Sequence, residues 1–325
     1  MQKEKLRWLE SMRGLACLIV LFAHILSVHP MYGRFASGCG KIGVWLFFIL
    51  SGFLLQYQAD VKEFTISKVL PYYWSKFLRL YPVYIVGLLL AKYTGLVPDG
   101  VSIIRHLLLQ EGVHHFWYMP VIIKFYLCAP FILLLYKTLN NRRVYIGILL
   151  IIFFAMSCVF PFTQYIENSI WIRWYVPVFI MGMLLSFVLE FLRKQERSLL
   201  GEILVVIGAV MIILPTPIMR FLIWDIEPSG YLQNKYLYMG VAWCLILIGI
   251  AKSKYICSLL EKCKILQVIG RISFWVYILH YIILHFLVPR LEWKWNACIT
   301  IILSVLLSLF MNKMEILLRR KANGG

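Results

Sequence analysis

The sequence predicts an all-α, polytopic integral membrane protein, with about ten transmembrane helices around a polar, pore-like cavity and both termini in the cytoplasm. Of its 325 residues, 62% are hydrophobic and only 15% are charged, and the mean hydropathy is +0.80. A soluble domain would be about 45–50% apolar. The apolar runs are long enough to cross a bilayer as helices and too continuous for barrel strands. We expect one membrane domain over residues 1–325, with no appended soluble domain.

Ten apolar runs are candidates for membrane spans. The first follows Lys3, Lys5 and Arg7, as the core of a signal peptide would. It contains Arg13 and His24 and lacks a convincing small-residue cleavage site, so we expect it to be retained as a span. The ten runs cover residues 8–29, 41–58, 80–97, 115–137, 144–162, 171–192, 200–219, 236–251, 266–288 and 295–317.

The basic residues of the connecting segments indicate how the chain is oriented. One set of alternate connections holds 21 Lys and Arg residues and the other set holds 8. Cytoplasmic loops carry the excess of basic residues, so we expect Asn323 and the N-terminus inside and Arg34 outside. The same alternation accounts for the net charge of +18 without a basic tail, and we therefore expect no nucleic-acid partner.

The first run carries two ionisable residues, Arg13 and His24, with only apolar or small residues between them. Eleven helical positions make about three turns, so the two side chains share a face and lie roughly 16 Å apart along the axis. An arginine in a membrane helix normally faces a protein interior or a wet cavity. We expect a polar shaft here. The competing interpretation of His24 is a packing histidine, and for His280 a packing role is the favoured one.

The inner connection over 59–79 is polar, basic and aromatic, and it includes Lys76 and Arg79. Two interpretations stay open for it: an interfacial anchor, or an anion site at the cytoplasmic mouth. Pro82 is expected in the first turn of the third span, where its missing N–H costs nothing.

The outer connections offer fewer signals. Helical spacing of apolar residues over 103–108 predicts a helix at the outer surface. His114 and His115 are adjacent and therefore point to different sides of a helix, which argues against a shared metal. The segment 215–235 is expected to be a loop, and three prolines are expected to kink spans: Pro120, Pro130 and Pro177.

The cysteines are expected to be small buried hydrophobic residues, because no Cys-x-x-Cys spacing occurs and most of the eight lie in apolar runs. The examples within predicted spans are Cys17, Cys128, Cys158 and Cys244.

The interiors of the predicted spans contain almost no carboxylates: Glu10 and Glu315 lie at the inner ends of their spans. Proton-coupled transporters relay protons through buried acidic residues, so this composition argues against a proton-coupled transporter. A histidine within the membrane and arginines near the cytoplasmic mouth remain. A neutral imidazole removes a proton from a hydroxyl near pH 7, and arginines hold phosphates by forked hydrogen bonds. This pairing favours transfer from a phosphate-bearing cytosolic donor to a hydroxyl acceptor.

In their order and spacing, these motifs resemble those of the acyltransferase 3 family of bacterial membrane proteins, over nearly the whole chain. Arg13 and His24 match the family's Arg-x10-His pattern. Residues 76–82 resemble its Arg-x-x-Arg pattern followed by an aromatic residue and proline, with Lys76 in place of the first arginine. Weaker similarities lie at 47–54, 116–118, 273–280 and Glu315.

The resemblance implies a multi-pass membrane O-acyltransferase that moves an acyl group, commonly acetyl from acetyl-CoA, to an extracytoplasmic or lipid-linked glycan. His24, with Arg13, would be catalytic, and Lys76 and Arg79 would bind the CoA phosphates. Lys76 keeps the positive charge of an arginine but lacks the paired N–H donors with which a guanidinium group binds two phosphate oxygens at once. The expected partners are acyl-CoA, the glycan and membrane lipids, with no metal and no permanently bound cofactor. Two alternatives stay open: an exporter of glycans or small molecules, and a non-catalytic assembly subunit.

Overall fold

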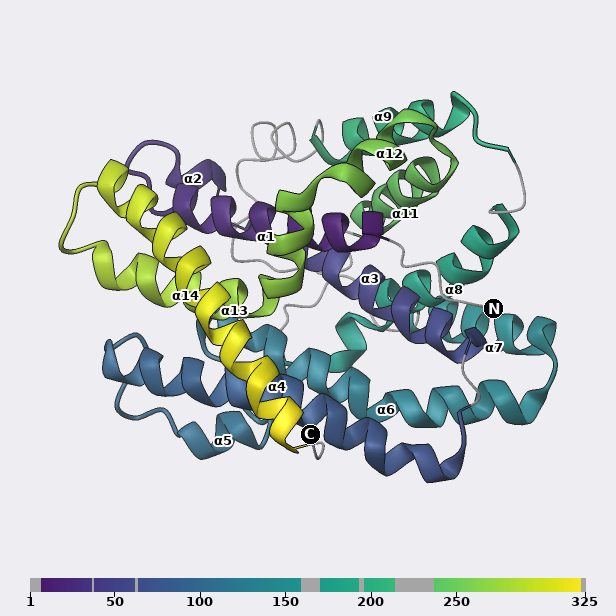
Figure 1. Cartoon of the computed structure of the whole chain (residues 1–325), viewed down its shortest axis with the longest axis horizontal. Helices are drawn as coiled ribbons and strands as arrows, with labels where there is room; N and C mark the ends of the chain where they lie inside the picture. Colours follow the sequence, from purple (N-terminus) through teal and green to yellow (C-terminus); the bar gives the residue numbers. More distant parts are fainter. Residues whose placement is uncertain are drawn as a thin grey trace.

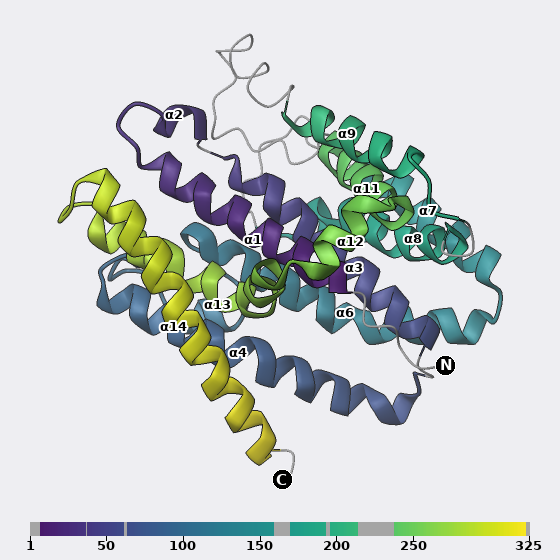
Figure 2. The same ribbon diagram turned by 45° about the horizontal axis from the view of Figure 1, so that its top comes forward.

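The computed structural model describes residues 7–36, 38–61, 64–158, 170–192, 196–213 and 237–322, and no strand occurs within these ranges. The helices pack into one bundle, with α1 (Arg7–Ser27) crossing its middle (Figures 1 and 2). The predicted loop at 215–235 lies outside the described residues, as do Lys3, Lys5 and Asn323. The all-helical fold class is confirmed.

Each of the ten apolar runs corresponds to a helix. Short helices occupy the connections between them: α2 (Gly33–Ala36), η1 (Ile66–Lys68), α5 (Ile103–Leu107), η2 (His114–Trp117), η3 (Ile172–Trp174) and α12 (Tyr255–Lys262). After α1, the main helices are α3 (Gly40–Val61), α4 (Val69–Tyr93), α6 (Tyr118–Leu139), α7 (Arg142–Cys158), α8 (Val176–Leu192), α9 (Leu200–Ile213), α11 (Leu237–Lys252), α13 (Lys264–Leu287) and α14 (Trp293–Ala322).

Six stretches of the described chain are long and apolar enough to cross a membrane, namely α1, α3, η1–α4, η2–α6, α13 and α14. A seventh is possible if α11 and α12, which meet at a 91° bend, form one broken span. Two further apolar helices, α8 and α9, are shorter. A multi-pass membrane architecture is therefore supported, while the number ten and the orientation of the termini stay predictions.

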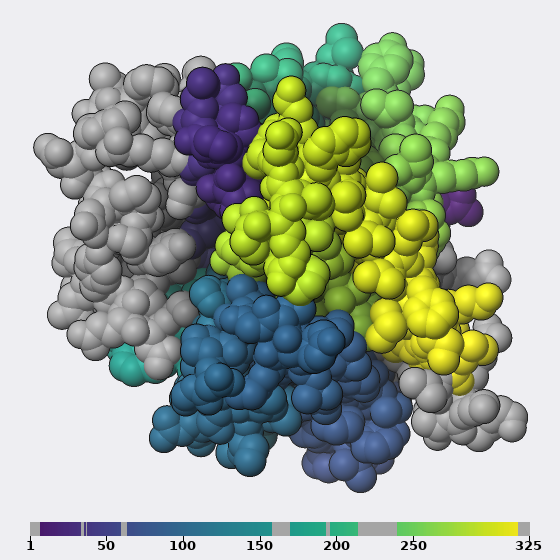
Figure 3. Space-filling model, turned by 90° about the vertical axis from the view of Figure 1, so that its left-hand side faces the viewer, coloured from purple at the N-terminus to yellow at the C-terminus, as the bar shows by residue number. Residues whose placement is uncertain are grey.

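The helix α14 is polar on its buried face and apolar on its exposed face, which is the reverse of a helix in a soluble protein and suits a lipid environment. Its inner face buries a stripe of polar residues one helical turn apart, and Thr300 donates to Asn296 Oδ1 at 3.0 Å. Small and polar side chains of this kind are typical of helix contacts inside membranes. Its opposite face is apolar and exposed, on the outside of the molecule (Figure 3). The buried polar stripe consists of Asn296, Thr300, Ser304 and Ser308.

The helix α4 begins at Val69, so the expectation of a non-helical connection up to Arg79 is wrong for residues 69–79. Hydropathy misses residues 69–79, the N-terminal part of α4, because their side chains are largely aromatic and basic. Their ring contacts follow helical spacing, as between Phe77 and Tyr81 at 4.8 Å. Pro82 consequently lies inside the helix, and Pro71 occupies the first turn that we expected Pro82 to hold.

Two other prolines also lie elsewhere in their helices than expected. Pro120 is the third residue of α6 and Pro177 the second of α8, so both occupy first turns, where no N–H is needed. Only Pro130, of the three, lies inside its helix. The predicted spans begin before the true helix starts, because the aromatic and aliphatic residues of η2 and η3, such as Phe116, Trp117 and Ile172, continue directly into the helices.

The helices α1 and α13 touch through glycines on both sides. A Cβ on Gly14 would collide with the carbonyl oxygen of Leu266, and one on Gly270 with that of Glu10. Glycine is needed at both positions because the two backbones approach so closely. This contact fixes α13 against the face of α1 that carries Arg13 and His24.

Gly270→Ala is expected to destabilise the protein by about 1–3 kcal/mol, because the added methyl group has only backbone to displace. Gly147→Ala is the matched control, since a Cβ at Gly147 meets nothing within 4 Å. Thermal unfolding in detergent measures both variants. Equal midpoints for the two would show that the glycine contact does not determine how α1 and α13 pack.

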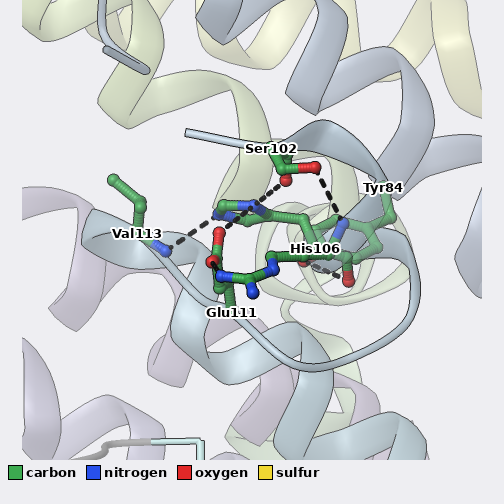
Figure 4. A network of polar contacts seen from close by, with 6 residues as sticks. Tyr84, Ser102, His106, Glu111 and Val113 are labelled. Carbon is green, nitrogen blue, oxygen red and sulfur yellow. Dashed lines mark hydrogen bonds and ion pairs between the residues drawn. The ribbon is translucent and has the colours of Figure 1, made fainter. Parts of the chain in front are cut away.

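The segment that leads into His114 and His115 folds around a buried histidine, His106 (Figure 4). Its Nδ1 lies 3.0 Å from the carbonyl oxygen of Ser102, and its Nε2 accepts from the backbone N–H of Val113 at 3.2 Å. Tyr84 donates to the carbonyl of His106 at 3.3 Å and so ties the segment to α4. The predicted outer helix is present as α5 but spans only Ile103–Leu107.

Candidate active site

Two cavities open along α1, and Arg13 and His24 line different ones. The helices α1 and α13 run in the same direction, since Arg13 of α1 lies beside Ser273 of α13 and His24 of α1 lies beside His280 of α13. Each end of the Arg13–His24 face therefore meets its own set of α13 side chains.

The inner cavity has a volume of about 80 Å³ and gathers three cationic side chains, Arg13 from α1 and Lys76 and Arg79 from α4. No acidic residue occurs among the described residues that line it. The Lys76 ammonium lies 4.2 Å from the centre of the Tyr126 ring, and Arg13 Nη2 lies 3.5 Å from Ser273 Oγ. Because Lys76 and Arg79 are one turn apart on α4, the helical start of α4 is what aims both into this cavity. The arrangement favours an anion.

The outer cavity is larger, at about 430 Å³, and its lining mixes aromatic and polar groups. That volume is within the range of ordinary ligand pockets, whereas the inner cavity is far below it. It is lined by His24, His114, His115, Ser27, Lys41, Trp117, Tyr277 and Tyr281, with small or apolar residues between them: Val20, Gly38, Gly40, Val44 and Gly112.

Tyr277 is common to the linings of both cavities. Its hydroxyl donates to the carbonyl oxygen of His115 at 2.5 Å, and its ring lies 5.1 Å from that of Tyr118. The expected continuous polar shaft is therefore divided into two chambers, because a buried tyrosine from α13 stands between Arg13 and His24. The sequence of α1 alone does not predict this division, because Tyr277 is contributed by another helix.

His24 makes its closest polar contact with His280 of α13. Nδ1 of His24 and Nε2 of His280 are 2.7 Å apart, and His280 is fully buried. Sequence reasoning favoured a packing role for His280 and so missed this contact. The only available signal was its place in the 273–280 motif, which does not name a partner on α1.

The adjacent His114 and His115 differ as expected: His114 is exposed, while His115 is buried with Nε2 3.0 Å from the carbonyl oxygen of Ile278. Within the described residues, no group of three or more His, Cys, Asp or Glu side chains is placed to hold a metal ion.

Glu10 and Glu315, the acidic residues predicted to lie at inner span ends, hold helices together. Glu315 of α14 accepts from the indole N–H of Trp275 at 2.8 Å, and Glu10 of α1 pairs with Arg271 at 3.3 Å. These contacts connect α13 to α14 and to α1, so both glutamates have a structural explanation.

The cysteines only partly follow expectation. Cys17 is buried and Cys244 is partly buried, but Cys128 is exposed, because it lies on the outward face of α6. The side chain of Cys158 lies outside the described residues.

An all-helical bundle with apolar outer faces and polar cavities fits a multi-pass membrane protein. A family model described as an acyltransferase domain matches residues 6–313, nearly the whole chain. The protein belongs to the acyltransferase 3 family, which supports a membrane acyltransferase activity. No curated protein and no solved structure matches the chain.

Proposed function

We propose that the protein is an O-acetyltransferase of the bacterial cell membrane, which moves acetyl from acetyl-CoA to a hydroxyl of an extracytoplasmic or lipid-linked glycan. The proposal rests mainly on the placement of two different cavities along α1. Arg13 lines the inner cavity together with two other cationic side chains, and His24 lines the larger, aromatic outer cavity. Tyr277 lies between the two cavities.

The donor is proposed to enter through the inner cavity. Cations hold the CoA phosphates, and Arg79 offers the forked donor geometry that Lys76 lacks. A volume of about 80 Å³ holds only the narrow thioester end of the donor, so the phosphates are proposed to stay at the mouth, beside the partly exposed Lys76 and Arg79. The thioester then reaches His24 only by passing Tyr277.

The acceptor is proposed to occupy the outer cavity. Trp117, Tyr277 and Tyr281 supply flat apolar surfaces with polar edges, which suit the faces of a sugar ring. Ser27 and Lys41 supply polar groups that fix its orientation.

The reaction is a direct transfer. Nε2 of His24 takes the hydroxyl proton as the oxygen bonds to the thioester carbonyl carbon. The C–S bond then breaks, and the imidazolium of His24 returns the proton to the departing thiolate. Ester and free CoA are the products, and no proton is gained or lost overall.

This mechanism places the donor mouth in the cytoplasm, in agreement with the proposed ten-span topology and cytoplasmic termini. Cysteines placed at Asn323 and at Arg34 test that topology with an impermeant thiol reagent added outside intact cells. We expect labelling at position 34 and none at 323. Labelling at 323 would contradict the orientation.

Purified protein incubated with labelled acetyl-CoA and glycans from the host tests the activity itself. We expect release of CoA and acetyl esters on the glycan, identified by mass spectrometry and absent from cells without the gene. An exporter would move solute without consuming acetyl-CoA, and an assembly subunit would tolerate the loss of His24.

A further inference from the structure

We propose that His280 is the positioning residue of the His24 base, fixing the tautomer that leaves Nε2 of His24 unprotonated at the outer cavity. The inference rests on the proposed function only where it predicts rates. The tautomer itself follows from the contacts of the two rings.

The chain of hydrogen bonds begins at a backbone carbonyl. Nδ1 of His280 lies 2.8 Å from the carbonyl oxygen of Val276, one turn earlier on α13. A carbonyl oxygen only accepts, so Nδ1 of His280 carries the proton. In a neutral imidazole the other nitrogen, Nε2, is then an acceptor.

That acceptor faces His24. Nδ1 of His24 lies 2.7 Å from it and must donate, which leaves Nε2 of His24 with a free lone pair. The two ring planes are nearly parallel, with 15° between them, and the ring centroids are 5.0 Å apart, which fits a hydrogen bond directed along the plane of each ring. The opposite tautomer of His24 would set two lone pairs against each other at 2.7 Å.

The Nε2 edge of His24 is next to Gly40, which has no side chain to cover it. A Cβ at Gly40 would lie 3.6 Å from Nε2, in van der Waals contact. The lone pair therefore opens to the outer cavity that both residues line.

His280 also suits the charged state of the base. When Nε2 of His24 takes a proton, both of its nitrogens donate, and Nε2 of His280 remains the acceptor for Nδ1. A base held and polarised by a third group is the usual arrangement in nucleophilic catalysis. Here the third group is a neutral imidazole, and among the described residues lining the cavity none is a carboxylate.

A purely structural histidine has a different pattern in this fold. Both nitrogens of His106 are engaged: Nδ1 lies beside the carbonyl oxygen of Ser102, with the Glu111 carboxylate 3.5 Å away, and Nε2 accepts from the backbone N–H of Val113 (Figure 4). His280 uses one nitrogen for the backbone and the other for a side chain that ends in an open lone pair.

Nitrogen-15 NMR of histidine-labelled protein in detergent, without substrate, tests the tautomer, with the His24 signals assigned by their loss in His24→Gln. We expect His24 to be protonated at Nδ1 in the wild type. His280→Gln should preserve this state, because its amide oxygen accepts the same hydrogen bond. In His280→Leu we expect His24 to shift toward protonation at Nε2. The matched control is His29→Leu, just beyond the end of α1, whose ring packs on Tyr32 and Trp293 and which should leave the His24 signals unchanged.

Rates provide the second readout. His280→Leu should lower kcat by about 10²-fold, at the low end of general-base effects, with KM unchanged for both substrates. His280→Gln should recover most of that loss, because it restores orientation. Protonation at Nε2 of His24 in the wild type would overturn the proposal, as would equal losses in the Leu and Gln variants. A wild-type protein that binds but never transfers acetyl refutes the proposed function instead, and leaves the tautomer result standing.

Discussion

His24→Ala is expected to lose nearly all acyl transfer while keeping its fold. General-base assistance is worth about 10²–10⁴ in rate, and His24 lines the outer cavity with its Nδ1 held by His280. His24→Gln should not rescue the reaction, because an amide cannot take up a proton near neutral pH. Transfer of labelled acetyl by purified variants measures the effect.

The competing role for His24 is packing against α13, so stability must be measured beside activity. The unfolding midpoint of His24→Ala should stay near that of the wild type. A well-folded His24→Ala protein that transfers acetyl at a near-normal rate would leave only a structural role for the face shared by Arg13 and His24.

Arg79→Ala is expected to weaken acetyl-CoA binding by about 10- to 100-fold. A hydrogen bond to a charged group is worth about 1.5–3 kcal/mol, and every 1.4 kcal/mol is tenfold in affinity. Lys76→Arg should have a smaller effect, since it keeps the charge in the same cavity. Binding by cations should also weaken as salt is added.

Arg143→Ala is the matched control for a lost positive charge, because Arg143 is exposed on α7 and does not line either cavity. Its affinity for CoA should equal that of the wild type. If the CoA affinity of Arg79→Ala also equals that of the wild type, Arg79 does not contribute to donor binding.

Hydropathy was enough to find the ten longer helices of the described residues, because lipid demands long apolar helices whatever they pack against. It failed at α4, where Tyr72, Tyr73 and Trp74 make the first turns look like a connection. Those residues are helical because their side chains pair one turn apart, as Lys76 does with the Tyr72 ring at 5.3 Å.

The candidate site was only half visible from the sequence. Arg13 and His24 were found because both lie on one helix, where spacing alone predicts a shared face. Tyr277 and His280 were not assigned roles, because their contacts depend on how α13 packs against α1. That packing is set by Gly14 and Gly270, and no periodicity in either helix reports which partner a glycine touches.

In the proposed mechanism, the donor binds on the Arg79 side and transfer occurs on the His24 side. Sealed vesicles containing the protein in one orientation test it, because acetyl-CoA does not cross the membrane. With acetyl-CoA only on the Arg79 side and the glycan only on the His24 side, we expect acetylated glycan in the wild type and none in His24→Ala. Acetylation that proceeds equally well with acetyl-CoA supplied only on the His24 side would contradict this mechanism.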